Sequence, residues 1–472
     1  MNPRTRGAAA AAALVLLAPA ACAVHTERRT RPIADVTTVR TVDPAALPGT
    51  TAVTHIEQDA TRRVFASYPR IPGAGALTAR LAKAVAAEVR PFGAGADGAE
   101  PLPGGGVPEL NVQWSLTAAT SRVVGVRLVT WRYFGTSGGE SRATYWYDAA
   151  TRTAHPSADL VDGPAGLATL AERVRERLGS RANPAQVRAA ADTFPSLAFN
   201  EAGDLVAEFS DYTVAPGSAG RVAVALDRDA ADPLLSAFGR RARDAALDAR
   251  PHPASSQAPP PPAKAGTPRT DCGRAKCIAL TFDDGPGPGT RRLLSTLSAH
   301  GARATFFVVG ENAAADPALL REAVAAGNEI GNHTQGHRDL TRMPAMQVNT
   351  DVQRTQDVLR AALGRCTTLL RPPYGATNST VAGVAKSLGL TEVLWNADPA
   401  DWRERDPAAV AARTIAFARP GAILVLHDTH EPTIEAMPEV LRRLTRAGYT
   451  FVTVTNLMAT RKPPQGSPFS GL

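Results

Sequence analysis

Two adjacent carboxylates, Asp283 and Asp284, follow a short apolar run in the stretch Thr-Phe-Asp-Asp-Gly-Pro. Gly285 and Pro286 stop regular structure, so both acids are predicted in a tight turn at the end of a strand. Neighbouring side chains at a strand end point in different directions, so one acid can bind a metal while the other faces a substrate. Alone, an Asp-Asp-Gly sequence is more often a turn with two solvated acids.

Two histidines, His333 and His337, are four residues apart in the stretch His-Thr-Gln-Gly-His. We expect them on one helical turn, where both imidazoles face the same way and can bind one cation. By itself such a pair is more often a surface coincidence. Together with Asp284 it offers two nitrogens and one carboxylate oxygen and leaves positions open for water, which is typical of a catalytic metal site.

Short apolar runs that alternate with amphipathic helices must position these residues. Seven strands are predicted, at residues 278–282, 304–309, 329–333, 368–371, 391–396, 422–427 and 450–454. This alternation predicts a parallel β/α architecture, and the number of strands favours a barrel over an open sheet. In such barrels the chemistry gathers where strands end, which is where both acids and both histidines fall.

Three more clusters follow later strands: Arg-Pro-Pro-Tyr-Gly at 371–375, Asp-Pro-Ala-Asp-Trp at 398–402 and Val-Leu-His-Asp at 425–428. In this order, the five clusters resemble the five motifs of the NodB-type polysaccharide deacetylases, carbohydrate esterase family four. The resemblance covers about residues 271 to 456. It implies that the C-terminal half folds as a distorted (β/α) barrel of the NodB type.

The resemblance also implies a role for each motif residue. It implies Asp283 as general base, Asp284, His333 and His337 as metal ligands, Arg371 as the partner of Asp283, the backbone N–H of Tyr374 as an oxyanion donor, His427 as general acid, Asp401 as the group that raises the pKa of His427, and Trp402, Val425 and Pro373 at the substrate pocket. The family usually has leucine where Val425 stands. A structural salt bridge for Arg371 and a buried, hydrogen-bonded His427 are the alternatives.

A divalent metal is the implied cofactor. Zinc is the first choice for two histidines and one aspartate, with cobalt, manganese and nickel as alternatives. The implied reaction is hydrolysis of N-acetyl groups on an amino-sugar polymer, peptidoglycan or a chitin-like glycan. One alternative is an O-acetyl (xylan) esterase of the same fold. Another is a wall-binding or lysozyme-sensing protein in which the barrel is inactive.

Residues 1–21 have the pattern of an export signal: early arginines, an apolar run at 8–17 and small residues before Cys22. The small residues resemble the end of a bacterial lipoprotein box, although Pro19 replaces its usual leucine. We therefore expect an exported chain whose Cys22 carries a lipid on the outer face of the cell membrane, with plain secretion as the alternative. Peptidoglycan follows as the expected substrate, because a tethered enzyme meets the wall first.

Length and composition predict how the rest of the chain is divided into domains. At 472 residues it is too long for one ordinary domain, and 44% hydrophobic with 20% charged residues excludes a wholly disordered chain. The net charge of +8 comes without a basic stripe, so no nucleic-acid partner is expected. The predicted divisions are a signal peptide (1–21), a tether (22–49), an extracellular domain (50–248), a proline-rich linker (249–270), the deacetylase domain (271–460) and a tail (461–472).

The domain at 50–248 is predicted to be α+β. Apolar residues every four positions at 77, 81, 85 and 89 predict a helix, and alternation around 124–128 and 145–147 predicts a hairpin. Residues 209–226 resemble an uncharacterised extracellular domain found beside deacetylases and in lysozyme-sensing anti-sigma factors. Five aromatic residues could stack on sugars or, as we prefer, pack on the sheet: Trp114, Trp131, Tyr133, Tyr145 and Trp146.

Three cysteines remain, Cys272, Cys277 and Cys366. In an exported protein an odd number predicts one disulfide and one leftover thiol, and the spacing does not choose the pair.

Overall fold

The computed structural model describes residues 37–58, 61–94, 107–134, 138–178, 183–216, 221–248, 270–460 and 468–472. The predicted signal peptide, Cys22 and nearly all of the proline-rich linker lie outside these residues. Among the helices described, none combines the length and the apolar character that crossing a bilayer requires.

The N-terminal part is built on a six-stranded sheet in the order β1-β2-β3-β4-β5-β6. Its strands are β1 (Thr51–Gln58), β2 (Arg63–Arg70), β3 (Glu109–Ala119), β4 (Val123–Tyr133), β5 (Gly138–Asp148) and β6 (Thr153–Pro156). Only β2 and β3 run parallel, and α1 (Gly75–Ala94) connects them. Leu77, Leu81 and Val85 of α1 are buried, and β4 pairs with β5 as a hairpin, so the predicted helix and hairpin are confirmed.

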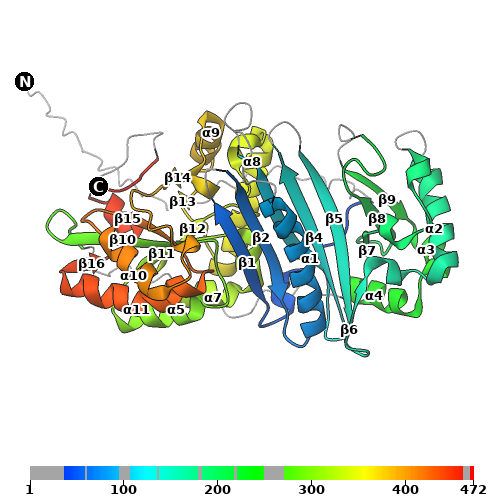
Figure 1. Cartoon of the computed structure of the whole chain (residues 1–472), viewed down its shortest axis with the longest axis horizontal. Coiled ribbons are helices and arrows are strands. Elements are labelled where there is room, and N and C mark those ends of the chain that lie inside the picture. The colour runs from blue at the N-terminus through cyan, green and yellow to red at the C-terminus, as the bar shows by residue number, and fades with distance from the viewer. Residues whose placement is uncertain are drawn as a thin grey trace, which may run out of the picture.

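A second, three-stranded sheet completes the N-terminal part. It consists of β7 (Ser196–Phe199), β8 (Leu205–Phe209) and β9 (Val222–Leu226). The helices α2 (Gly163–Leu178), α3 (Arg228–Ala231) and α4 (Ala237–Asp248) lie at the same end of the molecule, beside this sheet (Figure 1). Apolar residues of these helices and of all three strands form one buried cluster. The predicted α+β class is confirmed.

The C-terminal part contains all seven predicted strands. They are β10 (Lys276–Asp283), β11 (Ala304–Val308), β12 (Glu329–Asn332), β13 (Leu369–Leu370), β14 (Thr391–Glu392), β15 (Ile423–His427) and β16 (Tyr449–Phe451). Six form a parallel sheet in the order β14-β13-β12-β11-β10-β15, and β16 pairs with the start of β10. An isolated bridge between Ala397 and Leu424 links the chain after β14 to β15. The sheet therefore curls into the predicted distorted barrel.

Helices surround this sheet. They are α5 (Thr290–Ala299), α6 (Gly310–Ala315), α7 (Pro317–Ala325), α8 (Ala345–Leu363), α9 (Ser379–Ser387), α10 (Pro407–Ala416), α11 (Glu431–Arg446) and α12 (Val454–Met458). The end of the predicted tail also belongs to the barrel. Phe469 is buried and bridges to Val393, and the Leu472 N–H donates to the Gly421 carbonyl.

Cys272 and Cys277 form a disulfide at the start of β10. The predicted leftover thiol was wrong, since no cysteine in the described ranges is free.

The six-stranded sheet packs directly on the barrel. In Figure 1, β1 and β2 stand beside the barrel and β5 lies farther from it. Ser67 Oγ of β2 donates to Asn312 Oδ1 of α6 at 3.3 Å, and the Trp114 N–H of β3 donates to Glu311 Oε2 at 3.3 Å. Ala315 of α6 belongs to the apolar cluster of the sheet. The two parts thus share a packed interface.

The aromatic residues of this sheet are used in packing. Trp114 and Trp146 are buried. Trp131 and Tyr133 lie under two guanidinium groups of the barrel, Arg338 at 4.6 Å and Arg342 at 4.3 Å from the ring centroids. Tyr145 lies under Arg80. The preferred interpretation, packing on the sheet, fits these contacts, and two of the rings help to join the two domains.

A pH-dependent contribution to stability follows from Glu311 in this interface. Burial raises its pKa to about 8, although the hydrogen bond from the Trp114 N–H opposes the shift. In the unfolded chain the carboxyl ionises above about pH 4.5, so the folded state loses stability as the pH rises from there toward 8. We expect Glu311→Gln to raise the melting temperature at pH 8 more than at pH 5. Glu172→Gln on the exposed face of α2 is the control, and a variant less stable than wild type at both pH values would contradict the expectation.

Candidate active site

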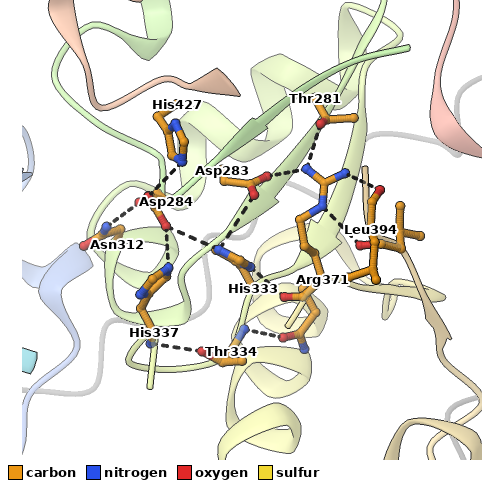
Figure 2. A network of polar contacts seen from close by, with 12 residues as sticks. Thr281, Asp283, Asp284, Asn312, His333, Thr334, His337, Arg371, Leu394 and His427 are labelled. Carbon is orange, nitrogen blue, oxygen red and sulfur yellow. Dashed lines mark hydrogen bonds and ion pairs between the residues drawn. The ribbon is translucent and has the colours of Figure 1, made fainter. Parts of the chain in front are cut away.

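The carboxylates Asp283 and Asp284 lie at the carboxyl end of β10. Asp283 pairs in register with His427 of β15, which brings the first and last motifs side by side. Asp284 has a left-handed backbone (φ 72°), so the chain turns sharply between the two acids and they point in different directions (Figure 2). Gly285 next to them packs against Asp428, and a Cβ at this glycine would lie 2.2 Å from Asp428 Oδ1.

The two histidines come together from a loop after β12. The predicted helical turn was wrong, because Thr334 (φ 69°) and His337 (φ 56°) have left-handed backbones that a helix excludes. Side chains hold the loop instead: Asn332 Oδ1 accepts the Thr334 N–H at 2.8 Å, and Thr334 Oγ1 accepts the His337 N–H at 2.9 Å. The two rings nevertheless converge on Asp284, as Figure 2 shows.

Asp284, His333 and His337 form a buried cluster of metal-ligand type. Asp284 Oδ1 lies 3.3 Å from His333 Nε2 and 3.0 Å from His337 Nε2, and all three side chains are nearly inaccessible. One ligand atom from each residue lies within 4.8 Å of the others. Asp284 Oδ1 is buried without an ordinary hydrogen bond. A buried carboxylate oxygen left open between two imidazole nitrogens fits a divalent cation.

Protonation in this cluster suits a cation. Burial would raise the pKa of Asp284, but the imidazoles of His337 and His333 hold it well below its ordinary value. Burial lowers the pKa of His337. The His333 Nδ1 atom lies 2.6 Å from the Arg371 carbonyl oxygen, which places its proton on Nδ1 and leaves Nε2 facing Asp284. The set therefore offers one ionised carboxylate, the His333 Nε2 atom and the His337 imidazole, which are ligand groups that bind divalent metals.

Arg371 fixes Asp283. Its fully buried guanidinium donates from Nη1 to Asp283 Oδ1 at 2.8 Å and to Thr281 Oγ1 at 2.7 Å. The other nitrogens donate to the carbonyls of Val393 and Leu394, both at 3.2 Å. A guanidinium held at four points keeps the carboxylate of Asp283 oriented.

His427 and Asp401 form a second pair across the site. His427 Nδ1 lies 2.8 Å from Asp401 Oδ1, while Asp401 Oδ2 accepts the backbone N–H of His427 and the hydroxyl of Thr433. His427 Nε2 is left 3.8 Å from Asp284 Oδ2. Burial opposes protonation of this imidazole, but Asp401 and then Asp284 raise its pKa to about 10. The imidazole is therefore cationic over the physiological range.

A narrow pocket joins these groups. Its lining consists of Ile56, Asp283, Asp284, His333, His337, Tyr374, Trp395, Asp398, Trp402, Val425 and His427. Trp402 and Val425 are thus where the resemblance implied, whereas Pro373 is buried and absent from this lining. Tyr374 has a left-handed backbone (φ 63°), as does Ala400 before Asp401 (φ 52°). Backbone strain of this kind collects at functional sites.

Three lining residues were not assigned a role from the sequence. Asp398 lies in a recognised motif, and Trp395 precedes it by three positions. Ile56 comes from β1 of the N-terminal sheet, more than 200 residues away from the motifs. Only the fold shows that Ile56 lines the pocket, because an isoleucine in a strand has no pattern that would single it out in the sequence.

Comparison with known proteins places the barrel in a family. A family model described as polysaccharide deacetylase matches residues 270–393. The peptidoglycan-N-acetylglucosamine deacetylase PgdA of Listeria monocytogenes is 37% identical over 183 residues, which are 39% of each chain. The peptidoglycan-N-acetylmuramic acid deacetylase PdaC of Bacillus subtilis is 36% identical over 188 residues, 40% of each chain. The chain thus spans about two fifths of the length of these relatives.

A shorter relative is covered almost entirely. The chitooligosaccharide deacetylase of a Bradyrhizobium species is 34% identical over 195 residues, which are 38% of this chain and 89% of that protein. Among solved structures, PdaC of Bacillus subtilis is 35% identical with a TM-score of 0.38, covering 40% of this chain and 93% of that one. With one near-complete relative at this identity, and with all five motifs meeting in one pocket, the chain belongs to the polysaccharide deacetylase family.

Proposed function

We propose that this protein is a metal-dependent N-deacetylase that hydrolyses N-acetyl groups of peptidoglycan. The observation that carries the proposal is the buried, ionised Asp284 between two imidazoles, beside a second carboxylate held by Arg371. The first two relatives above are named for peptidoglycan and the third for chitooligosaccharides. All three relatives are named as deacetylases of amino-sugar glycans.

Asp284, His333 and His337 would hold the cation, with zinc as first choice and cobalt, manganese or nickel as alternatives. When bound there, a divalent ion would polarise the acetyl carbonyl and lower the pKa of a water molecule toward about 7. An amide is a poor electrophile, so the reaction needs this help.

Asp283 takes the proton of the attacking water. Its Oδ1 is committed to Arg371, whereas Oδ2 lies 3.9 Å from His333 Nε2 and is turned toward the ligand cluster. Arg371 orients this carboxylate, which a base requires. The new C–O bond forms at the acetyl carbon while the proton passes to the carboxylate.

His427 protonates the departing amine. Its Nδ1–H is held by Asp401, so Nε2 points into the pocket, 3.8 Å from Asp284 Oδ2. The C–N bond breaks as this proton reaches the sugar nitrogen, which leaves acetate and a free amine. Val425 and Trp402 supply an apolar wall for the acetyl methyl group. Valine is smaller than leucine and leaves more room there.

The location belongs to the same proposal. A lipid on Cys22 would hold the enzyme at the outer face of the membrane, next to the wall. The export pattern of residues 1–21 supports this placement.

The function is tested by acetate release from purified peptidoglycan, N-acetylglucosamine oligomers and acetylxylan, each with and without a chelator. We expect release from peptidoglycan that stops on chelation and returns with zinc. Activity on acetylxylan alone would replace the proposal by an O-acetyl esterase. No activity on any glycan, with wall or lysozyme binding retained, would favour a binding protein with an inactive barrel.

Two substitutions separate metal binding from proton transfer. We expect Asp283→Asn to keep zinc but lower kcat by about 100 to 10,000-fold, the usual loss when a general base is removed. His333→Ala should lose both zinc and turnover, because one of the three ligands is gone. Bound zinc is measured by elemental analysis after dialysis. Zinc retained at full occupancy in His333→Ala would show that the ligand set is different.

Asp401 sets the alkaline limit of activity. The general acid must be protonated, so activity falls as the pH rises through the pKa of His427. Asp401→Asn removes the negative charge that raises this pKa, so the alkaline limb of kcat/KM should move to lower pH by about 1 to 3 units. Asp357→Asn, exposed on α8, is the control. An unchanged alkaline limb in Asp401→Asn would remove His427 from the role of acid.

A further inference from the structure

The two histidines of the cluster are held in different ways. His333 has a hydrogen bond from Nδ1 to the Arg371 carbonyl within the barrel. His337 Nδ1 is buried and has no hydrogen-bond partner in the described structure. A metal-binding histidine usually donates its second ring N–H to a partner that fixes the ring. Something else must therefore orient His337.

An aromatic ring of the N-terminal sheet lies flat on this imidazole. Phe65 of β2 stacks on His337 with ring centroids 4.3 Å apart and an angle of 15° between the planes. Phe65 is completely buried, so its ring has little freedom to move. Tyr374 meets the same imidazole edge-on at 4.7 Å. These two rings restrict the rotation that a hydrogen bond would otherwise restrict.

The backbone of His337 is also held from the N-terminal sheet. Asn111 Nδ2, on β3, donates to the carbonyl of Gly336 at 2.8 Å and to that of His337 at 3.1 Å. Gln113 donates to the Gly336 carbonyl at 3.2 Å and to Asn111 Oδ1 at 2.8 Å, which orients the Asn111 amide. Because His337 has a left-handed backbone, the loop needs such support to keep its shape.

The residues after His337 are held by the same strands. Glu109 Oε1 of β3 accepts the backbone N–H of Asp339 at 3.1 Å, and Glu109 Oε2 accepts from Arg342 at 3.3 Å. Arg63 of β2 forms an ion pair with Asp339 and lies over the Tyr374 ring. Residues of β2 and β3 thus contact the loop both before and after His337 in the sequence.

We propose that the N-terminal domain is part of the metal site, with Phe65 and Asn111 as positioning residues that fix the ring and the backbone of His337. The inference rests on the proposed function in one respect, namely that the cation binds at Asp284, His333 and His337. It gives the N-terminal domain a role that the barrel motifs do not contain: setting the metal affinity of the barrel.

The test is zinc affinity of the full chain, measured by competition with a chromophoric chelator. Phe65→Leu removes the stacked ring and Asn111→Ala removes both backbone hydrogen bonds. Each should weaken zinc binding by about 10 to 100-fold, the usual effect of losing a group that orients a ligand. Phe199→Leu is the matched control, because Phe199 is equally buried in the N-terminal part but belongs to the apolar cluster of the three-stranded sheet.

The zinc affinities of these variants decide whether Phe65 and Asn111 position His337. Wild-type affinity in both Phe65→Leu and Asn111→Ala would overturn the inference, as would an equal loss in Phe199→Leu. If Phe65→Leu fails to fold, Asn111→Ala together with Gln113→Ala carries the test, with circular dichroism confirming the fold. His333→Ala separates this inference from the proposed function. If His333→Ala still binds zinc, the proposed ligand set is refuted. If His333→Ala loses zinc while the Phe65 and Asn111 variants keep wild-type affinity, only the positioning role is refuted.

Discussion

The rest of the structure depends on one buried carboxylate. Asp284 is ionised although it is almost inaccessible, and its Oδ1 faces two imidazole nitrogens without an ordinary hydrogen bond. Such a charge is costly to bury unless a cation or other positive group compensates it. The barrel meets this requirement by bringing four strand ends together. β10 supplies the two acids, β12 leads into the histidine loop, β13 leads into Arg371, and β15 ends at His427 beside Asp283.

The polar residues of the site differ in their partners, and these partners follow from the geometry. Arg371 binds Asp283 and leaves Asp284 to the imidazoles, so two adjacent acids have different partners. Asp401 raises the pKa of His427 far above that of a free imidazole, whereas burial lowers the pKa of His337. The pKa values of these two histidines of one pocket therefore shift in opposite directions, as different roles for them would require.

Much of this arrangement was predictable from the sequence. The seven strands of the barrel each carry their own apolar run, so their positions and the gathering of motifs at strand ends followed from local pattern. The helical turn for His333 and His337 was wrong because the side chains of Asn332 and Thr334 stabilise a loop that spacing alone does not reveal. The sequence did not predict that Ile56, Phe65 and Asn111 lie at the site. They read as ordinary strand residues, and their neighbours at the site lie more than 200 positions away.

The closeness of the two domains has a consequence for how such modules can be recombined. Gly336 leaves room for the Gln113 amide, and a Cβ there would lie 2.2 Å from it. A barrel grafted from another protein with any larger residue at this place would not dock on this sheet without shifting that amide. If the amide moved, its hydrogen bonds to the Gly336 carbonyl and to Asn111 Oδ1 would be lost, so a chimaera with a complete set of motifs would still lack one contact that supports the histidine loop.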